Sequence, residues 1–202
     1  MEFQDAIRQR AMVRSFSSES VHRAAIDRIL GAALRSPTAG NSQGTRWVVL
    51  EGNAQTAVYF DLTTDETWRS DHAQWNEGLR RAPVVLLTYT SPDQYVARYR
   101  EPDKVSSGLG AGPEVWPVPY WYGDAAFGVM AVLLAAVDAG LGACILGAFR
   151  GEAELAEALG VPGGWRLFCA VVLGHPDGRD HRTHSLDRTE STFDERVHRG
   201  KW

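Results

Sequence analysis

Two arginines near the N-terminus have the chemistry to bind a phosphate group. Arg10 and Arg14 stand four residues apart, at the end of an expected helix over residues 3–10. Residues four apart on a helix are neighbours, so both guanidinium groups could bind one phosphate through forked N–H donors. A solvated basic helix end, stabilised by the helix dipole, would give the same spacing, and spacing alone favours that plainer interpretation.

A polar loop over residues 36–43 could hydrogen-bond the edge of a flat heterocycle. Its sequence, SPTAGNSQ, offers hydroxyl, amide and backbone groups to carbonyl and ring-nitrogen atoms. Proline, glycine, asparagine and serine also form ordinary turns, so the loop alone is weak evidence for a site.

A third segment, over residues 124–149, brings a glycine to the end of a strand. An apolar helix is followed by the turn Gly140-Leu141-Gly142, a short strand and then Leu146-Gly147. A glycine at a strand end lets a ligand come close to the backbone. Packing between the helix and the strand explains the segment by itself, so it carries weight only with the other two.

Other candidate motifs do not fit their context. Gly108, Gly110 and Gly112 resemble a dinucleotide-binding loop, but they follow no buried strand and open no convincing helix. Four residues with the chemistry of metal ligands lie in a polar segment, where solvated side chains are the better interpretation: His175, Asp180, His181 and His184. We therefore expect no metal, and no serine stands in a recognisable nucleophile elbow.

The order of helix and strand patterns predicts an α+β sandwich. Buried apolar runs predict strands over residues 47–50, 83–89, 143–146 and 167–173. Helical spacing predicts helices over residues 20–34, 124–139 and 152–159, with residues 54–82 helical in parts. Because strands and helices do not alternate strictly, the helices should cover a mixed sheet rather than a doubly wound parallel one.

Two side chains are expected to cap helices. Ser20 would cap the helix over residues 20–34, and Asp124 the helix over residues 124–139. Apolar residues run all round the second helix, which predicts burial on every side. Its apolar stretch, over residues 125–137, is too short to cross a membrane.

Composition indicates one soluble globular domain in the cytoplasm. Of 202 residues, 44% are hydrophobic and 23% charged, which is ordinary for a folded chain. The net charge of -4 argues against nucleic acid as a partner. Residues 1–14 hold no apolar run like that of a signal peptide, and Cys144 and Cys169 fit two buried thiols better than a disulfide.

Two long polar segments remain. An insertion over residues 92–122 begins with a short helix and ends in aromatic residues; loops of this length are usually functional or mobile. The polar tail over residues 175–202 ends in Trp202, a large aromatic side chain that would dock on a surface such as a partner subunit.

Together and in this order, the three segments resemble the FMN-dependent nitroreductase family. The family pattern has an R-R-S-x-R-x-F stretch, a P-S-x-x-N-x-Q loop, a helix that starts at Asp and ends in G-L-G, and a charged arm. The matching residues are Arg10, Arg14, Phe16, Pro37, Thr38, Asn41, Gln43, Asp124, Leu134, Ala136, Gly140, Leu141, Gly142, Val197, His198 and Trp202. An ordered combination is more specific than any one motif. It implies a three-layer sandwich with a mixed, mainly antiparallel sheet, in one domain over residues 1–202 whose C-terminal arm wraps a dimer partner.

The resemblance also implies where the phosphate of FMN would bind. Arg10 and Arg14, with the backbone of Ala11 and Met12, would hold it, and Arg188 in the arm would add a third cation.

The flavin ring would lie at the interface of a homodimer. Pro37, Thr38 and Asn41 would contact it from the opposite subunit. Backbone N–H groups near Leu146 and Gly147 would face the flavin N5 atom, where a donor stabilises the reduced flavin.

The implied activity is that of an oxidoreductase with a ping-pong mechanism. NADH or NADPH would give a hydride to the flavin, and a quinone, nitroaromatic or other electron-poor small molecule would then take the electrons. Because the flavin carries the chemistry, no catalytic acid–base pair is required, and no catalytic side chain is assigned. Trp116, Tyr120 and Trp121 are expected to form an aromatic lid over flat substrates, or else a patch that the partner subunit covers.

Three departures from the family pattern leave alternatives open. Met12 replaces a serine, Gly44-Thr45-Arg46 replaces Pro-Trp, and Glu190 stands where the arm often has a cation. Weakened phosphate binding would suit a non-catalytic protein that sequesters flavin, a deazaflavin-binding protein, or a homodimer with a degenerate site. A sequestering protein would bind flavin without being reduced by NADH or NADPH.

Overall fold

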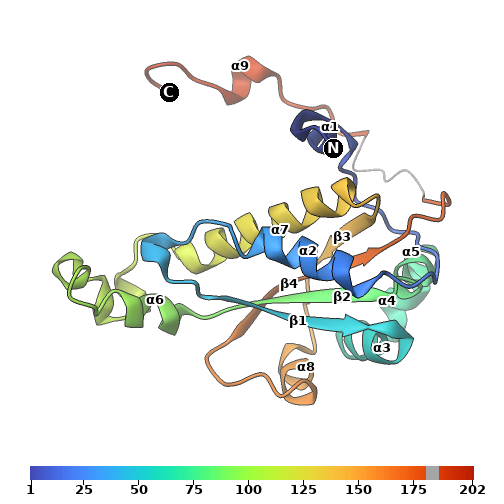
Figure 1. The fold of residues 1–202 in the computed structure, drawn as a ribbon, viewed down its shortest axis with the longest axis horizontal. Coiled ribbons are helices and arrows are strands. Elements are labelled where there is room, and N and C mark those ends of the chain that lie inside the picture. Colours follow the sequence, from blue (N-terminus) through green and yellow to red (C-terminus); the bar gives the residue numbers. More distant parts are fainter. Residues whose placement is uncertain (181–186) are drawn as a thin grey trace.

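A four-stranded antiparallel sheet forms the centre of the molecule. A computed structural model describes residues 1–180 and 187–202 (Figure 1). The sheet order is β1-β2-β4-β3, with β1 at Thr45–Glu51, β2 at Val84–Thr90, β3 at Gly142–Leu146 and β4 at Arg166–Gly174. Each neighbouring pair is antiparallel, and one parallel bridge joins Met12 to Ala143. The four expected strands and the α+β class are confirmed.

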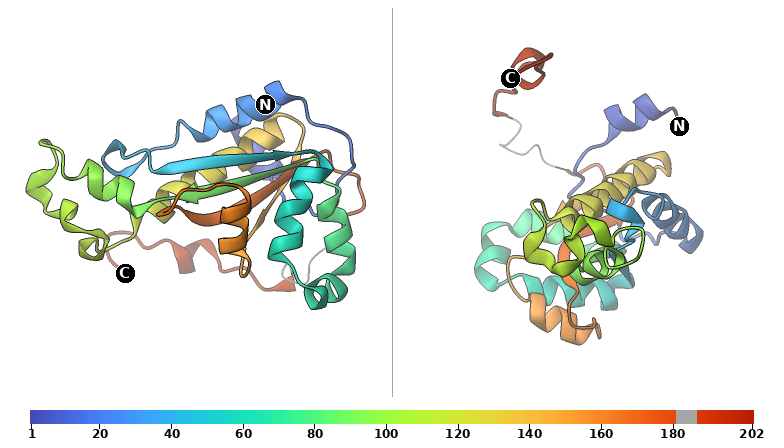
Figure 2. Two further views of the ribbon diagram at one scale, coloured as in Figure 1. Left: turned by 90° about the horizontal axis from the view of Figure 1, so that it is seen from below. Right: turned by 90° about the vertical axis from the view of Figure 1, so that its left-hand side faces the viewer.

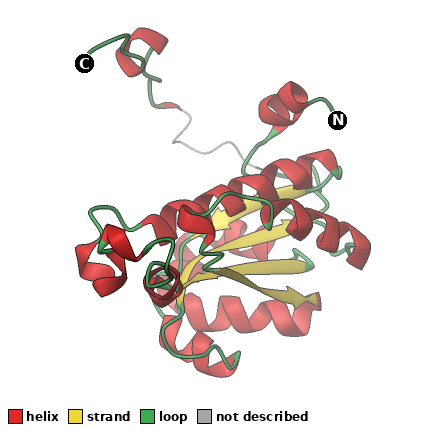
Figure 3. Ribbon diagram, turned by 60° about the vertical axis from the view of Figure 1, so that its left-hand side comes forward, coloured by secondary structure: helices red, strands yellow, loops and turns green. Residues whose placement is uncertain are grey.

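Helices cover both faces of the sheet and make a three-layer sandwich. The helices α2 (Arg23–Ala33) and α7 (Tyr120–Asp138) lie on one face, and α3 (Gly52–Thr63) and α8 (Glu152–Ala158) on the other (Figures 1 and 3). The remaining helices are α1 (Phe3–Gln9), α4 (Glu66–Asp71), α5 (Ala73–Arg80), α6 (Pro92–Arg98) and α9 (Phe193–Arg196).

The alternation of side chains along β2 explains the two cores. Val84 and Leu86 pack into the cluster beneath α2 and α7, whereas Val85 and Leu87 pack into the cluster beneath α3, α5 and α8. Successive residues of a strand face opposite sides of a sheet, so an all-apolar strand must lie in the middle layer. All seven residues of β2 are buried, as the sequence predicts.

Both predicted helix caps are wrong. The N-cap of α2 is His22, whose ring accepts the Ala24 backbone N–H, rather than Ser20. Helix α7 begins at Tyr120, so Asp124 lies in its second turn instead of capping it. The aromatic residues before Asp124 form the first turn of the helix, and Pro119 is its N-cap.

The central helix α7 is longer and less buried than its apolar sequence predicts. Phe127 and Met130 are 54% and 39% exposed, so one face lies outside the chain's own core. Its 19 residues also suffice, by length and composition alone, to cross a membrane. Here α7 instead packs against α2 and the sheet as a core helix. Gly140 (φ 72°) ends it with paired 6→1 and 5→2 hydrogen bonds, the helix stop that the sequence predicts.

The two long polar segments differ in how they join the body. The insertion holds α6 and short 3-10 turns, and it projects at one end of the molecule (Figure 1). The C-terminal arm holds α9, which begins with a capping box at Thr192 and Glu195. Figure 2 shows the arm away from the sheet, with the C-terminus far from the core. Phe193 and Trp202 of the arm are exposed.

Candidate functional site

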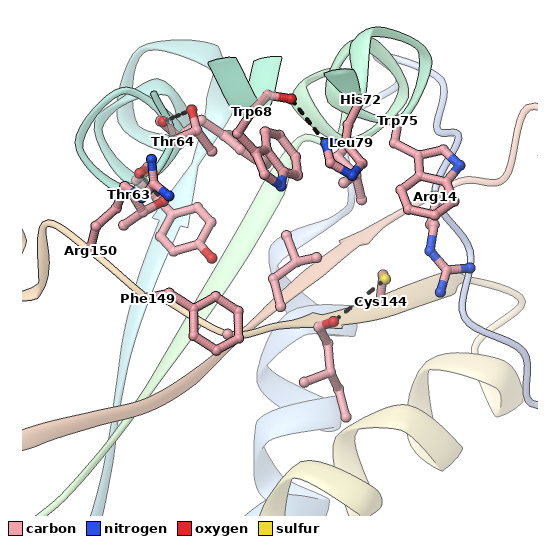
Figure 4. Close-up of a pocket in the computed structure, with 15 residues that line it drawn as sticks. Arg14, Thr63, Thr64, Trp68, His72, Trp75, Leu79, Cys144, Phe149 and Arg150 are labelled. Atoms are coloured by element: carbon pink, nitrogen blue, oxygen red, sulfur yellow. Dashed lines mark hydrogen bonds between the residues drawn. The ribbon is translucent and has the colours of Figure 1, made fainter. Parts of the chain in front are cut away.

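A pocket of about 270 Å³ lies where β3 ends. We call it the Arg14 pocket (Figure 4). Its walls come from α3, from α4 and α5, and from the end of β3. The residues that line it are Arg14, Tyr59, Phe60, Thr63, Thr64, Trp68, His72, Trp75, Leu79, Cys144, Ile145, Leu146, Gly147, Phe149 and Arg150. An apolar, aromatic-lined cavity with a few polar groups is the usual form of a small-molecule site.

Three aromatic side chains form one wall of the Arg14 pocket. Trp68 and His72 stack with ring centroids 5.1 Å apart, and His72 and Trp75 lie 5.7 Å apart. The junction of α4 and α5 places these rings on one side, because His72 ends the first helix and begins the second. A ring nitrogen of His72 lies 3.1 Å from the carbonyl of Trp68, which fixes the ring. The three rings therefore form a stack along one side of the pocket.

Arg14 stands at the edge of this wall. Its guanidinium carbon lies 5.2 Å from the centroid of the Trp75 ring, and its Nη1 donates to the carbonyl of Met12 at 3.1 Å. Gly78 brings α5 close to this segment, since a Cβ atom at Gly78 would overlap the Arg14 carbonyl. One positive charge is therefore held beside the aromatic wall.

The helical arrangement predicted for the two arginines is wrong. Helix α1 ends at Gln9, and the following chain is extended, with Met12 bridged to Ala143 of β3. Over four extended residues the chain advances about 13 Å, so Arg10 and Arg14 are not the neighbours that they would be on a helix. Arg14 lines the pocket, whereas Arg10 does not.

The backbone after β3 forms the opposite side. Leu146 and Gly147 line the pocket, as the resemblance implies. The ring of Phe149 is 94% exposed, and it lies over Gly147, where an added Cβ atom would come within 2.9 Å of it. Burial raises the pKa of the Cys144 thiol to about 11, so this thiol is protonated at neutral pH.

A second, polar pocket of about 210 Å³ adjoins the first, and we call it the Arg81 pocket. It shares Arg14 and Trp75 with the Arg14 pocket and adds Ser15, Arg81 and Arg179, among others. The aromatic-lined space is thus next to a polar space lined by three arginines and by the acids Glu77 and Asp180.

Asp177 fixes the wall of the Arg81 pocket. Its carboxylate accepts hydrogen bonds from Ser15 Oγ (3.0 Å), Arg81 Nη2 (3.0 Å) and the backbone of Arg179 (2.9 Å). Although partial burial acts the other way, these bonds and the charge of Arg81 hold the pKa of Asp177 below its ordinary value. Arg81 also donates to the carbonyl of Phe16, so this cluster ties the start of the arm to the Arg14 segment.

The loop over residues 36–43 lines a different cavity of about 460 Å³, which we call the loop pocket. Pro37, Thr38 and Asn41 lie there, and none of them lines the Arg14 pocket. The backbone of the loop is strained: Asn41 and Gln43 have φ values of 57° and 50°, a conformation that side chains rarely adopt. Such strain persists only where surrounding contacts fix it, and it gathers at functional sites.

The contact that fixes the loop comes from Asp124. This buried carboxylate accepts the Ala39 backbone N–H at 2.7 Å and the Tyr95 hydroxyl at 2.8 Å. Burial, together with the hydrogen bond to Asp124, raises the pKa of Tyr95. Arg98 Nε adds a hydrogen bond to the carbonyl of Gly40. Asp124 therefore orders the loop, in place of the helix-capping role predicted from the sequence.

Two of the three residues expected in an aromatic lid lie in the chain's own interior. Trp116 and Trp121 are each 7% exposed and pack around Tyr95. Tyr120 alone of the three is at the surface, 46% exposed. Their role as substrate contacts stays a prediction, and the packing shows that the two tryptophans serve the insertion's small core.

The remaining predicted residues lie outside these pockets. Ala11 and Met12 are in the extended segment beside β3, and Arg188 is exposed in the arm. Within residues 1–180 and 187–202, no group of three His, Cys, Asp or Glu side chains could hold a metal ion. His181 and His184 lie outside the described residues, so the expectation about metal stays a prediction.

Sequence reasoning missed the aromatic wall and the residues opposite it. Trp68, His72 and Trp75 recur at helical spacing, i, i+4 and i+7, in a segment whose other residues lack a clear pattern. That spacing places the three rings on one side of a helical segment and could have identified the aromatic wall from the sequence. Arg150 also lines the pocket and pairs with Asp65, a contact between distant segments that spacing does not reveal.

Comparison with known proteins defines the class to which this fold and site belong. The model of the nitroreductase family matches residues 7–175, which is most of the chain. The chain belongs to the nitroreductase family, and it is in general terms an oxidoreductase of the flavin-dependent type.

Several known proteins are similar along nearly the whole chain. A protein of Archaeoglobus fulgidus named "Putative NADH dehydrogenase/NAD(P)H nitroreductase" is 25% identical over 196 residues, covering 96% of this chain and 94% of that protein. The nitroreductase CinD of Lactococcus lactis, solved with chloramphenicol, superposes with a TM-score of 0.70 at 21% identity, covering 95% of this chain and all of that one. A BluB-like flavoprotein of Clostridium difficile gives 0.67 at 18% identity, with the same coverage. These two structures show the fold.

Proposed function

We propose that the chain binds FMN in the Arg14 pocket and uses NADH or NADPH to reduce electron-poor acceptors such as quinones and nitroaromatics. The observation that carries the proposal is the continuity of two spaces. An aromatic-lined cavity, with Trp75 on its wall, leads past Arg14 into a polar cavity whose cations, Arg81 and Arg179, lie among the acids Glu77 and Asp180. A ligand with a flat ring and an anionic tail, such as FMN, matches this division.

The residues present fit such a cofactor. Aromatic rings offer stacking and edge contacts to a flat heterocycle. The backbone after β3 is open at Gly147, where only the exposed Phe149 ring would meet an added side chain. Arg14, which lines the pocket, would bind phosphate oxygens through forked N–H donors. Arg188 and the backbone of Ala11 and Met12 are further candidates for the phosphate.

Bound FMN would supply the chemistry of accepting a hydride and passing electrons on, in a ping-pong sequence. The protein would contribute position and solvent exclusion. The wall of Trp68, His72 and Trp75 would keep water from one side of the ring, and Phe149 would move aside or cover the ligand. Backbone donors near Leu146 and Gly147 would stabilise negative charge on the ring.

We propose a homodimer as the functional unit. Pro37, Thr38 and Asn41 line the loop pocket instead of the Arg14 pocket, so contact with the same flavin requires the loop of a second copy. The exposed face of α7 and the exposed Trp202 of the arm supply apolar surface for that copy to cover. The two free, buried cysteines suit the reducing cytoplasm, where we expect the protein to act.

A non-catalytic flavin-sequestering protein is the second candidate. It is favoured by Met12, whose side chain packs against both hydrophobic clusters and so offers a phosphate no hydroxyl donor. Such a protein would bind FMN and leave it oxidised.

The visible spectrum of the purified protein, followed by anaerobic addition of NADPH and then NADH, tests these functions. We expect flavin absorbance that bleaches with one of the donors and returns when a quinone is added. Flavin that stays oxidised would favour sequestration. A colourless protein that takes up no added FMN would contradict both functions.

A further inference from the structure

We propose that His72 donates the proton that is consumed when a quinone is reduced in the Arg14 pocket. The inference rests on the proposed function and adds a catalytic side chain to it. A quinone becomes a quinol by accepting one hydride and one proton. NADH or NADPH supplies the hydride through the cofactor, so the proton must come from a side chain or from water.

The ring of His72 lies in the middle of the aromatic wall. Trp68 stands on one side of it, with ring centroids 5.1 Å apart and ring planes 18° apart, and Trp75 stands on the other, at 5.7 Å and 30° (Figure 4). The two indoles cover the faces of the imidazole, so its edge is the part that a ligand can meet. Such an edge offers a hydrogen bond rather than a stacking surface.

One nitrogen of this edge is already engaged. Nδ1 of His72 lies 3.1 Å from the carbonyl oxygen of Trp68. A carbonyl oxygen can only accept a hydrogen bond, so Nδ1 carries a hydrogen. Nε2 is therefore the nitrogen that gains and loses a proton, and it lies on the side of the ring that faces β3 across the pocket (Figure 4).

The other ionisable side chains that line the Arg14 pocket, among the described residues, are poor proton donors at neutral pH. Burial raises the pKa of the Cys144 thiol to about 11, and it also raises the pKa of Tyr59, so both groups keep their protons. Arg14 and Arg150 are guanidinium groups, which do not lose a proton in proteins. Imidazole is the side chain that ordinarily changes charge between about pH 5 and 8, which suits a proton donor.

His72 also connects the Arg14 pocket with solvent. It lines a further cavity of about 270 Å³, which we call the outer pocket, together with the exposed residues Asp71, Ala73 and Gln74. His72 itself is partly exposed. A donor that acts in every turnover has to recover its proton, and water in the outer pocket can return it. The charged groups that share one of these two pockets with His72 are Asp71, Arg14 and Arg150.

The proposed step balances in atoms and charge. The Nε2–H bond of the charged His72 breaks, and an O–H bond forms on the quinone oxygen that becomes negative when the hydride arrives. The neutral imidazole then takes a proton from water. In sum, NADH or NADPH, one proton and a quinone give the oxidised nicotinamide and a quinol.

The test separates the two halves of the reaction in the FMN-loaded protein by stopped-flow absorbance. The first half is bleaching of the flavin by NADH or NADPH, which consumes no proton. The second is reoxidation, either by the quinone menadione or by ferricyanide, which takes single electrons and no proton. Wild type, His72→Asn and His22→Asn are compared. Asparagine can still donate to the Trp68 carbonyl, and in the control it still caps α2, where His22 is exposed.

We expect His72→Asn to slow reoxidation by menadione about a hundredfold, the lower end of the usual effect of a general acid. Reduction by the donor, reoxidation by ferricyanide and all rates of His22→Asn should not change. The wild-type menadione rate should fall as the pH rises through the range in which imidazole loses its proton, and the His72→Asn rate should not. An unchanged menadione rate in His72→Asn, or equal slowing with ferricyanide, would overturn the proposal.

A second readout requires no turnover. The NMR signals of the histidine rings in the flavin-free protein, followed from about pH 5 to pH 8, show whether His72 gains and loses a proton. Its signal is identified by its absence from His72→Asn. A His72 ring that keeps one charge state over this range would overturn the proposal.

Failure of the proposed function would look different. A wild type whose flavin is reduced by neither NADH nor NADPH would contradict the oxidoreductase activity. Dithionite would then reduce the flavin instead, and reoxidation by menadione and by ferricyanide would still decide on the role of His72.

Discussion

The Arg14 pocket and the loop pocket are built in opposite ways. The loop pocket depends on one contiguous stretch, residues 36–43, which is visible in the sequence and is held in a strained conformation by the buried Asp124. The Arg14 pocket collects single residues from α3, α4, α5 and the end of β3, and none of its lining residues has a positive φ. A contiguous motif can thus be recognised in the amino-acid sequence. A site assembled from several elements can be recognised only once the fold is known.

Substitutions in the two pockets should also have different effects. Loss of a buried contact should disorder the loop pocket and lower stability. Loss of a charge at the rim of the Arg14 pocket should weaken ligand binding and leave the fold intact.

The largest effect is expected for Asp124→Ala. The change leaves the Ala39 N–H and the Tyr95 hydroxyl without their acceptor, at about 1–3 kcal/mol for each buried donor, so the free energy of unfolding should fall by about 2–6 kcal/mol. Urea denaturation measures this. Asp27→Ala, an exposed acid on α2, is the matched control and should stay within about 0.5 kcal/mol of the wild type. Equal stability of the two variants would mean that Asp124 does not order the loop.

Arg14→Ala is expected to weaken FMN binding by about 1.5–3 kcal/mol, because a charged hydrogen-bond donor to the phosphate is lost. The free energy of unfolding without FMN should hardly change. Equilibrium dialysis against FMN measures the first quantity, and Arg8→Ala, an exposed arginine of α1, controls for charge. If Arg14→Ala purifies with a full complement of flavin, the phosphate binds elsewhere, and the Arg14 pocket is not the phosphate site.

Asp177→Asn is expected to lower stability at neutral pH by about 1–2 kcal/mol, through weakened bonds to Ser15 and Arg81. The pKa of Asp177 is lowered in the folded state. Its contribution is therefore complete above the ordinary aspartate pKa, and it is lost as pH falls through the lowered value. Unfolding free energies at pH 7 and in acid should converge for the two proteins at low pH. A constant difference across that range would exclude the ionised Asp177 as the cause.

The smallest effect is expected for Tyr95→Phe. It removes one donor to Asp124 and leaves the bond from Ala39, so the loss should be about 1 kcal/mol of stability. In combination with Asp124→Ala, the tyrosine change should add almost nothing, because the two residues share one interaction. A fully additive double variant would show that they act separately.

The sequence predicted the framework of the fold because apolar patterning is local. All four strands and helices α2, α7 and α8 coincide with runs or spacings of apolar residues. Helix starts were less predictable, since Ser20 and Asp124 both have the chemistry of caps. Which residue caps a helix depends on contacts with distant parts of the chain. Asp124, for example, accepts a hydrogen bond from the backbone N–H of Ala39, 85 residues away.

The candidate site was predictable only in part, for the same reason. Arg14, Leu146 and Gly147 were identified through the family pattern, and the structure brings them together around one pocket. The wall of Trp68 and Trp75 was not identified, because its helices carry weak periodicity. Trp116 and Trp121 were expected in a lid, and their burial around Tyr95 follows from packing that spacing cannot reveal.

A crystal structure of the protein with FMN would show directly whether the cofactor binds in the Arg14 pocket between two copies of the chain. We expect the isoalloxazine ring between the Trp68–Trp75 wall and the backbone of Gly147, with phosphate oxygens bound by Arg14 and the 36–43 loop of a second copy against the ring. Electron density for FMN at another place, or FMN bound by a monomer without that loop, would contradict it.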